Sequence, residues 1–480
     1  MIKAIIFRFY LLLLPFSLLA KTLEENPVVS KHSITINNTP IEYQTAAGSY
    51  ITQSKSGHKA KVYFVSYFKT GEDAKERPIT FCFNGGPGAS STFLQLGGIG
   101  PKKAALDIND ASKRFKIQDN DLSILDLTDL VFIDPVSTGY SHALDKKKEK
   151  LFHGVERDID ILSEFIRLFL IKNDRFASPK YLLGASYGAY RVIGLLLNLE
   201  KRKILCQGVI LISPALDLNL INLGDEEDLT YIFSLPTYAA IASYHGKIQE
   251  NDLSHLLEKA EYFSKTTYLT TLFQGNNVQK KDKLETLKKL NEFTSLDISL
   301  IKKSNLRIAP SVFTKQLLAS QNKLVGRFDG RITGSSYLNL KPWSEYDPSF
   351  SSIVTTLNSA YHVFAKNTLR FEIEEEYRIL ANVFPWKGFS QGEIAPSFRD
   401  DIARLMSIYP FFKMFVASGI YDLATPYFGT SYYLSHLNVP LRPVYPIEHH
   451  IYPAGHMLYM DKAVLPDLKR DLTNYFQLVR

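Results

Sequence analysis

A glycine-flanked serine between a predicted strand and a predicted helix is the feature that most restricts the fold. The segment Gly184-Ala185-Ser186-Tyr187-Gly188 follows an apolar run at 181–183 and precedes an apolar, helix-like run at 190–197. A strand that turns this sharply into a helix brings backbone against backbone, which glycine tolerates best. The pattern predicts a serine hydroxyl exposed at the edge of a sheet, above the start of a helix. An ordinary strand–helix turn gives the same pattern, so the rest of the chain has to decide between them.

Short apolar runs alternate with helical patterns over the first 213 residues. Apolar residues at helical spacing predict a helix over 153–173. Strands are predicted at 33–36, 41–43, 61–68, 78–83, 129–134, 181–183 and 208–213. This alternation predicts an α/β fold with a central, mostly parallel sheet that helices cover.

The periodicity changes after Pro214, and residues 222–400 are mostly helical, polar and rich in lysine. We interpret this stretch as a helical cap, inserted into a core that consists of residues 21–221 and 401–480. Within the second part of the core, the strand pattern resumes at 412–419 and recurs at 442–446. A last helix is predicted over 462–479.

Residues 1–20 have the pattern of a secretory signal peptide. Lys3 and Arg8 form a basic start, an apolar core covers 9–19, and Ala20 is the expected last residue before cleavage. The pattern predicts an exported protein, periplasmic or secreted. The apolar run is short for a membrane span, so no stable membrane insertion is expected once the signal is removed.

Composition narrows the range of partners and cofactors. The chain has 480 residues with a formal net charge of +7, and acids interrupt its short basic runs at 146–150 and 280–283. Such runs are typical of a solvated surface, so no nucleic-acid partner is expected. Cys82 and Cys206 are the only cysteines, and their places beside predicted strands favour two buried thiols. The sequence lacks four Cys or His residues at metal-ligand spacing, so no structural zinc site is expected. No other metal and no organic cofactor is implied by the sequence.

A serine nucleophile needs a base within hydrogen-bond reach and a carboxylate that orients the base. In the order serine, acid, histidine, the chain offers Asp422 after a predicted strand and His456 in a loop before the last helix. His449 and His450 are alternative bases, and Asp134 is an alternative acid, although it precedes the serine. Loops at the carboxyl ends of strands bind ligands in such sheets, which favours Asp422 and His456.

Acyl transfer also requires N–H groups aimed at the developing oxyanion. The segment Asn84-Gly85-Gly86-Pro87-Gly88 ends a predicted strand and offers unhindered backbone N–H groups. A plain glycine turn would look the same, but the segment lies where one half of such a site is expected. The N–H group of Tyr187 would provide the other half.

Four motifs, taken together and in this order, resemble the serine carboxypeptidase family. They are Asn84-Gly85-Gly86-Pro87-Gly88, Asp134-Pro135-Val136-Ser137-Thr138-Gly139-Tyr140-Ser141, Gly184-Ala185-Ser186-Tyr187-Gly188 and Gly455-His456-Met457. Residues 63–67 and 326–331 look like the bacterial branch of that family. Together these motifs extend over most of the chain.

The resemblance implies an α/β-hydrolase fold with a helical cap and the removal of single residues from the C-termini of peptide substrates. It implies Ser186 as the nucleophile, His456 as the base and then the acid, and Asp422 as the orienting carboxylate. An esterase or acyltransferase acting on a non-peptide acyl group is the alternative with the same catalytic residues. A non-catalytic binding protein on the same scaffold is the alternative from a different class.

The resemblance also implies which residues bind the substrate. The N–H groups of Gly86 and Tyr187 would form the oxyanion hole. Asn84 and Gly85 would hold the terminal carboxylate of the peptide. Met457 would line the pocket for the leaving residue. Simple packing of Met457 in the core is an equally good interpretation.

Two positions depart from the family pattern. Better-known members have a glutamate directly before the serine, where this chain has Ala185, and an ungapped match puts Gly98 where a second glutamate commonly lies. The resemblance implies that these acids bind the substrate carboxylate when they are protonated, which suits acidic pH. We therefore expect carboxylate recognition to be weaker here, or less dependent on acid pH. Arg191, five residues after the serine, is expected to point elsewhere.

Replacing Ala185 by glutamate tests this expectation. Because a hydrogen bond to a charged group is worth about 1.5–3 kcal/mol, Ala185→Glu should lower peptide KM by about tenfold where the new carboxyl is protonated. The benefit should disappear as pH rises above the pKa of that carboxyl. Peptide KM measured between about pH 4 and about pH 8 checks this. A KM that changes neither in size nor in pH dependence would contradict the expectation.

Overall fold

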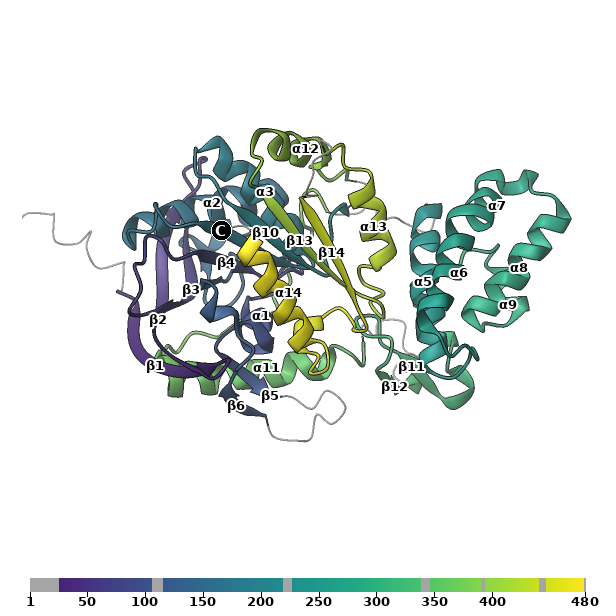
Figure 1. Ribbon diagram of the computed structural model, residues 1–480, viewed down its shortest axis with the longest axis horizontal. Helices are drawn as coiled ribbons and strands as arrows, with labels where there is room; N and C mark the ends of the chain where they lie inside the picture. The colour runs from purple at the N-terminus through teal and green to yellow at the C-terminus, as the bar shows by residue number, and fades with distance from the viewer. Residues whose placement is uncertain are drawn as a thin grey trace, which may run out of the picture.

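The computed structural model describes residues 26–105, 115–218, 227–337, 346–389, 393–439 and 446–478. The predicted signal peptide and most of the strand predicted at 442–446 lie outside these ranges. Figure 1 shows a large sheet with helices on both of its faces and a further group of helices beyond one edge of the sheet.

One sheet organises the described chain. Its strands are β1 (Val28–Ile36), β2 (Thr39–Gln53), β3 (Lys59–Lys69), β4 (Ile79–Phe83), β7 (Asp129–Ile133), β8 (His142–Ala143), β9 (Lys180–Ala185), β10 (Gly208–Ile212), β13 (Lys413–Gly419) and β14 (Ile447–Tyr452). They lie in the order β1-β2-β3-β7-β4-β9-β10-β13-β14, and β8 pairs with β3. From β7 to β14 all neighbours are parallel, whereas β1, β2, β3 and β7 pair antiparallel. The predicted mostly parallel sheet is confirmed.

Two short hairpins lie outside this sheet. They pair β5 (Lys102–Ala105) with β6 (Lys116–Asp119), and β11 (Lys323–Val325) with β12 (Thr333–Ser335).

Both faces of the sheet are buried by helices. Against one face pack α2 (Val155–Lys172), α3 (Tyr187–Lys201) and α12 (Arg399–Ile408). Against the other pack α1 (Thr92–Leu94), α11 (Ser351–Phe364) and α14 (Leu465–Leu478). Side chains alternate between the faces along each strand: in β9, Leu182 joins the first group while Tyr181 and Leu183 join the second. This explains why the central strands are continuous apolar runs.

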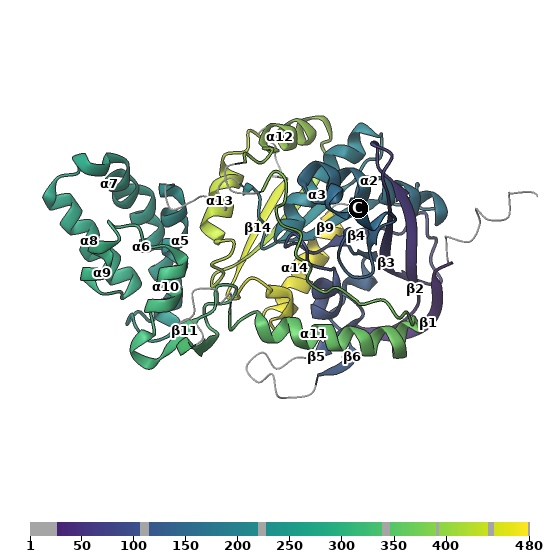
Figure 2. The same ribbon diagram turned by 180° about the vertical axis from the view of Figure 1, so that it is seen from behind.

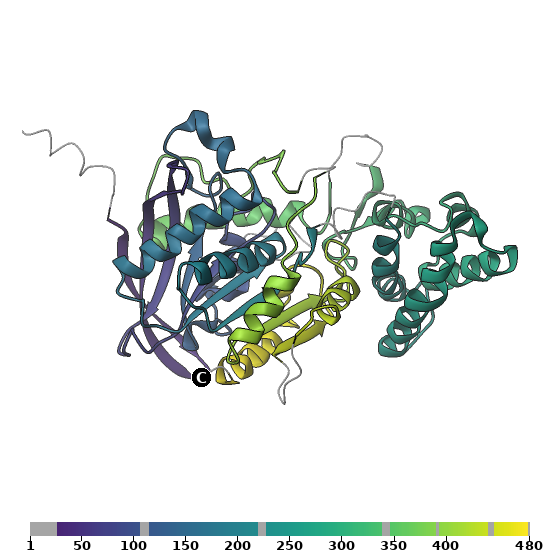
Figure 3. The same ribbon diagram turned by 90° about the horizontal axis from the view of Figure 1, so that it is seen from above.

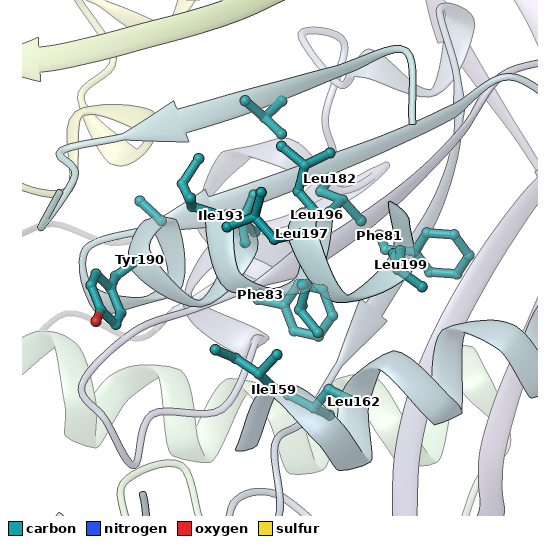
Figure 4. Packing of buried hydrophobic residues seen from close by; sticks show 14 of the residues in the cluster. Phe81, Phe83, Ile159, Leu162, Leu182, Tyr190, Ile193, Leu196, Leu197 and Leu199 are labelled. Carbon is teal, nitrogen blue, oxygen red and sulfur yellow. The ribbon is translucent and has the colours of Figure 1, made fainter. Parts of the chain in front are cut away.

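The helix that follows the glycine-flanked serine is firmly packed. Figure 4 shows α3 against the strands and beside α2, with Leu196 and Leu199 near Phe81 and Leu182 of the strands. These four side chains are each at most 1% exposed. Burying one large apolar side chain is worth about 1.5–3 kcal/mol, so α3 is fixed on the sheet by its whole inner face.

A separate helical group forms the cap. It consists of α5 (Asp228–Tyr244), α6 (Leu253–Phe263), α7 (Leu269–Gln274), α8 (Lys280–Thr294), α9 (Ile298–Lys303) and α10 (Pro310–Gln316). These helices bury an apolar cluster of their own, in which the rings of Tyr238 and Phe313 stack with centroids 4.1 Å apart. The cap meets the core where Phe233 of α5 packs on Tyr432 of α13 (Tyr427–Ser435), with ring centroids 5.1 Å apart. Figures 1 and 2 show this group at one end of the molecule.

Packing divides the predicted insertion of residues 222–400 into two parts. Residues 227–337 contain the cap helices and the β11–β12 hairpin. Helix α11, by contrast, packs on the sheet, with Leu357 and Tyr361 fully buried there. Figures 2 and 3 show α11 alongside the sheet and away from the cap helices. An apolar helix stripe has the same sequence pattern whether it faces a cap or a sheet, so the pattern could not separate the two parts.

Two further sequence expectations concern the cysteines and the membrane. Cys82 and Cys206 are both free and buried, which confirms the prediction of two thiols. In the part of the chain that the structure describes, no helix has both the length and the apolar character that crossing a membrane requires.

Two leucine substitutions test whether α11 is part of the sheet core and not of the cap. Leu357 in α11 and Leu290 in α8 are both 0% exposed, so replacing either by alanine should cost about 2–5 kcal/mol of stability. Leu357→Ala should increase amide hydrogen exchange in the strands of the large sheet, and Leu290→Ala should increase it only within residues 227–337. Mass-spectrometric hydrogen exchange checks this. Loosened cap helices with an unchanged sheet in Leu357→Ala would contradict the division.

Candidate active site

Loops that follow neighbouring parallel strands meet at one edge of the sheet. Ser186 directly follows β9, residues 84–88 follow β4, Asp422 follows β13 and His456 follows β14. The carboxyl ends of parallel strands share an edge, so these loops converge. One cavity at this edge is lined by most of the residues singled out from the sequence: Asn84, Gly86, Ser186, Tyr187, His456 and Met457.

Ser186 sits on a strained turn. Its φ is +59° and its ψ is −128°, a conformation that L-residues rarely adopt. A Cβ at Gly184 would lie 2.2 Å from the carbonyl oxygen of Gly188, and a Cβ at Gly188 would lie 2.5 Å from that of Phe83. The two flanking glycines are therefore required by the backbone contacts that hold the turn.

His456 and Asp422 are hydrogen-bonded to each other. His456 Nδ1 lies 2.7 Å from Asp422 Oδ2, and the carboxylate is fully buried. The N–H groups of Ala424 and Thr425 donate to Asp422 Oδ1 over 2.7 Å and 3.1 Å, and the Thr425 hydroxyl lies 2.7 Å from Oδ2. These contacts hold the carboxylate in place, where it orients the imidazole.

The backbone of His456 is fixed from two sides. Its N–H donates to the carbonyl oxygen of Phe328 over 2.6 Å, and its carbonyl oxygen accepts from the Ser213 hydroxyl over 2.7 Å. Within the described residues no hydrogen bond joins Ser186 Oγ to His456, although both line the cavity. Such contacts are often long without substrate and shorten when it binds. The arrangement can then move a proton between the hydroxyl and the imidazole.

The glycine-rich loop lies directly on the turn that carries Ser186. A Cβ at Gly85 would come within 2.6 Å of the Tyr187 nitrogen and 2.8 Å of Ser186 Cβ. Gly86 has a φ of +101° and lines the cavity. The N–H of Tyr187 is the first of α3 and has no acceptor within the helix. Backbone donors from the loop and from the turn are thus available next to the serine, as an oxyanion would require.

A buried arginine supports this loop from behind. Arg191 is 0% exposed, donates from Nε to Asp158 Oδ2 over 2.6 Å and donates from Nη1 to the carbonyl oxygen of Asn84. As expected from the sequence, it does not line the cavity. Asn84 Oδ1 is buried with no hydrogen-bond partner among the described residues, so its side chain is available to a bound molecule.

The alternative acid and bases lie outside the cavity. Asp134 is buried beneath the glycine-rich loop, where its carboxylate accepts from the Ser91 N–H over 2.8 Å and from the Tyr377 hydroxyl over 2.9 Å. His449 and His450 lie within β14. His449 contacts the Ser418 hydroxyl, and burial lowers its pKa to about 4.

Several residues at the site were not anticipated from the sequence. Phe328 contacts the His456 ring at a centroid distance of 5.1 Å, and Trp386 donates from Nε1 to the Tyr187 hydroxyl over 2.9 Å. Arg327 lines the cavity beside them. Phe328 and Arg327 both lie in the 326–331 motif, but that motif did not show where in the fold these two residues would lie.

The two positions that depart from the family pattern differ in their surroundings. Ala185 lines the cavity, so a larger side chain there would reach the substrate. A Cβ at Gly98 would lie 1.9 Å from the carbonyl oxygen of Tyr459, so no side chain fits at that position. Regarding metals, the described residues contain no cluster of three or more His, Cys, Asp or Glu that could hold an ion.

Comparison with known proteins gives matches to one family. Residues 37–456 match the family model described as serine carboxypeptidase. "Serine carboxypeptidase-like 5" of Arabidopsis thaliana is 26% identical over 201 residues, which cover 41% of this chain and 44% of that protein. "Carboxypeptidase Y homolog A" of Podospora anserina is 28% identical over 137 residues, which cover 28% of this chain and 22% of that protein. The matched region thus spans less than half the length of these relatives.

A solved structure shows the same fold. Kex1Δp, a prohormone-processing carboxypeptidase from Saccharomyces cerevisiae, is similar with a TM-score of 0.58 and 16% identity, over 90% of this chain and 91% of that one. Together with the family match, this likeness confirms the predicted α/β-hydrolase fold.

The buried Asp134 predicts a pH-dependent stability. Burial raises the pKa of Asp134 to about 7, compared with about 3.9 in an unfolded chain. Between these values the folded state binds more protons than the unfolded state, so this group makes the protein less stable as pH rises from about 4 to about 7. Asp134→Asn cannot ionise, so its stability relative to the wild type should rise by about 1.4 kcal/mol per pH unit in this window.

Urea unfolding of both proteins across this pH range measures the difference. A difference that is constant from about pH 4 to about pH 7 would show that Asp134 ionises normally.

Proposed function

Because the chain belongs to the serine carboxypeptidase family, we propose that it hydrolyses single residues from peptide C-termini through an acyl-enzyme. The observation that carries this proposal is the cavity in which Ser186, the Asp422-bound His456 and the glycine-rich loop come together. Each part of the chemistry of acyl transfer has a candidate group there: a nucleophile, a base with its orienting acid, and oxyanion donors.

The proposed reaction begins with attack of Ser186 Oγ on the last peptide carbonyl. His456 takes the hydroxyl proton at Nε2, while Asp422 holds the proton on Nδ1 and stabilises the imidazolium. The N–H groups of Gly86 and Tyr187 stabilise the oxyanion. His456 then gives the proton to the leaving amine, and a water molecule that His456 activates hydrolyses the acyl-enzyme.

Substrate binding is assigned to the walls of the same cavity. Asn84, which lines this cavity, would donate from its side-chain Nδ2, and the adjacent Gly85 would donate from its backbone N–H, to hold the terminal carboxylate. Met457 would line the pocket of the leaving residue, next to the apolar side chains Phe93, Phe350 and Tyr459. Such a pocket favours apolar or aromatic C-terminal residues.

The remaining proposals concern the setting of the enzyme. We propose that it is exported, that it acts in the periplasm or after secretion, and that it belongs to the bacterial branch of the family. Peptides are its proposed partners. The N-terminal pattern at 1–20 and the motif at 326–331 support these proposals.

The second candidate is an esterase or acyltransferase with the same catalytic residues. It is favoured by one observation: the cavity is lined by Ala185 and by no acidic side chain among the described residues. A cavity of this kind would also accept an acyl donor without a terminal carboxylate.

Labelling and product analysis test the proposed function. A fluorophosphonate should modify Ser186 in the folded wild type and not in Ser186→Ala, because only an activated serine reacts. Asp422→Asn should lower kcat by about ten-thousand-fold, since the imidazole takes the wrong tautomer. A panel of blocked peptides and simple esters, with products identified by mass, separates the two enzymatic candidates.

Each outcome of this panel is informative. Release of single C-terminal residues supports the carboxypeptidase, and turnover of esters alone supports the esterase or acyltransferase. Folded protein without an adduct on Ser186 would favour a non-catalytic binding protein.

A further inference from the structure

The cavity that contains Ser186 and His456 has an unbalanced charge. Among the described residues that line it, Arg327 is the one side chain with a permanent charge, and none is acidic. The other lining groups are apolar or neutral, apart from the titratable His456. An anion that enters this cavity therefore meets a single cation and no competing carboxylate.

The guanidinium of Arg327 is not used by the fold. Its backbone is fixed, since its N–H donates to Asp347 Oδ2 over 2.7 Å and its carbonyl oxygen accepts from the N–H of Leu423 over 3.0 Å. Its guanidinium lies over the ring of Phe328, 5.4 Å from the centroid, and makes no ion pair or hydrogen bond with any residue that the structure describes. The side chain itself is exposed to solvent.

Neighbouring arginines are occupied by structural contacts. Arg331, four residues further on, pairs with Asp329 over 2.6 Å and with Asp461 over 2.8 Å. Arg191 is buried against Asp158. These cations neutralise carboxylates of the protein itself, so Arg327 differs from them in having five N–H donors available to a ligand.

Arg327 also stands where two cavities meet. It lines a second cavity between the core and the cap, and this cavity shares Ala424 and Thr425 with the first. The next residue, Phe328, contacts the His456 ring and binds the His456 backbone N–H. A group that Arg327 binds on the side of the first cavity is therefore held next to Ser186 and His456. The buried Asn84 Oδ1, which has no partner among the described residues, is an acceptor and separately indicates that a ligand with an N–H or O–H donor, such as a peptide, enters this cavity.

We propose that Arg327 binds a carboxylate of the substrate. A planar guanidinium can donate two parallel hydrogen bonds to a carboxylate, which gives both affinity and orientation. The carboxylate has two possible sources, the C-terminus of the peptide or an acidic side chain in its acyl part. This proposal rests on the proposed hydrolase function. If it holds, residue 327, in the part of the chain that contains the cap, selects substrates that carry a carboxylate.

Two arginine variants and a matched control test the proposal. Arg327→Gln removes the charge, and Arg327→Lys keeps the charge but loses the fork of donors. Lys323→Ala removes an exposed positive charge from the same segment, in β11, outside both cavities. Equal melting temperatures and unchanged turnover of an uncharged ester would show that each variant is folded with an intact reaction centre.

The substrates come in pairs that differ in one carboxylate. One pair is a blocked peptide with a free C-terminus and the same peptide with a C-terminal amide. A second pair has Glu or Gln as the residue whose carbonyl is attacked. A third pair consists of two esters, one with a carboxylate on the leaving alcohol and one without. The ester pair keeps the proposal testable even if no peptide is cleaved, which would refute the proposed peptidase function alone.

Arg327→Gln should raise KM by roughly ten- to hundredfold for the carboxylate-bearing member of one pair and leave its partner unchanged, with little effect on kcat. Arg327→Lys should restore part of this loss, and Lys323→Ala should have no effect. The affected pair identifies the source of the carboxylate. Equal effects of Arg327→Gln on both members of every pair, or the same loss in Lys323→Ala, would overturn the proposal.

Discussion

Burial of the parallel sheet on both faces is the constraint on which the candidate site depends. Strands β4, β9, β10, β13 and β14 can lie side by side in parallel only because helices cover both faces. Their carboxyl ends then form one edge, from which the functional loops emerge. Strand β10 contributes no candidate catalytic residue, yet Ser213 at its end accepts from Thr425 through its carbonyl oxygen and donates to the backbone of His456. Ser213, directly after β10, thus joins the loop that contains Asp422 and Thr425 to the loop that contains His456.

Buried polar contacts give these loops their positions. The glycine-rich loop carries few side chains of its own, so it depends on groups beneath it: Arg191 binds the Asn84 carbonyl oxygen, and Asp134 binds the N–H of Ser91. Removing one partner of a buried ion pair such as Arg191 and Asp158 leaves a charge without compensation, which costs about 3–5 kcal/mol. The candidate oxyanion donors are therefore oriented by contacts that lie outside the cavity.

Much of the fold and the centre of the site could be predicted from the sequence, since both depend on local patterns. Alternating apolar runs predicted the sheet, and the order of Ser186, Asp422 and His456 along the chain predicted that these residues would meet at one edge. Thr425 could not be predicted, because a hydroxyl in a loop has no periodicity and its role depends on the path of that loop. The sequence also did not reveal that α11 faces the sheet, because an apolar helix stripe has the same pattern against either surface, or that Phe328 contacts the ring of His456. These contacts are between residues far apart in the chain, and only the packing determines them.

The contact between Gly98 and the carbonyl oxygen of Tyr459 restricts how this protein can evolve. Better-known relatives have two glutamates, at the positions of Ala185 and Gly98. A glutamate at position 185 would enter an open cavity, so this first acid needs only one substitution. The second acid cannot be added in the same way, because any side chain at position 98 would require the backbone at Tyr459 to move. The two changes are therefore unequal: one acid can be introduced alone, whereas the pair requires a rearrangement of the loop that follows His456.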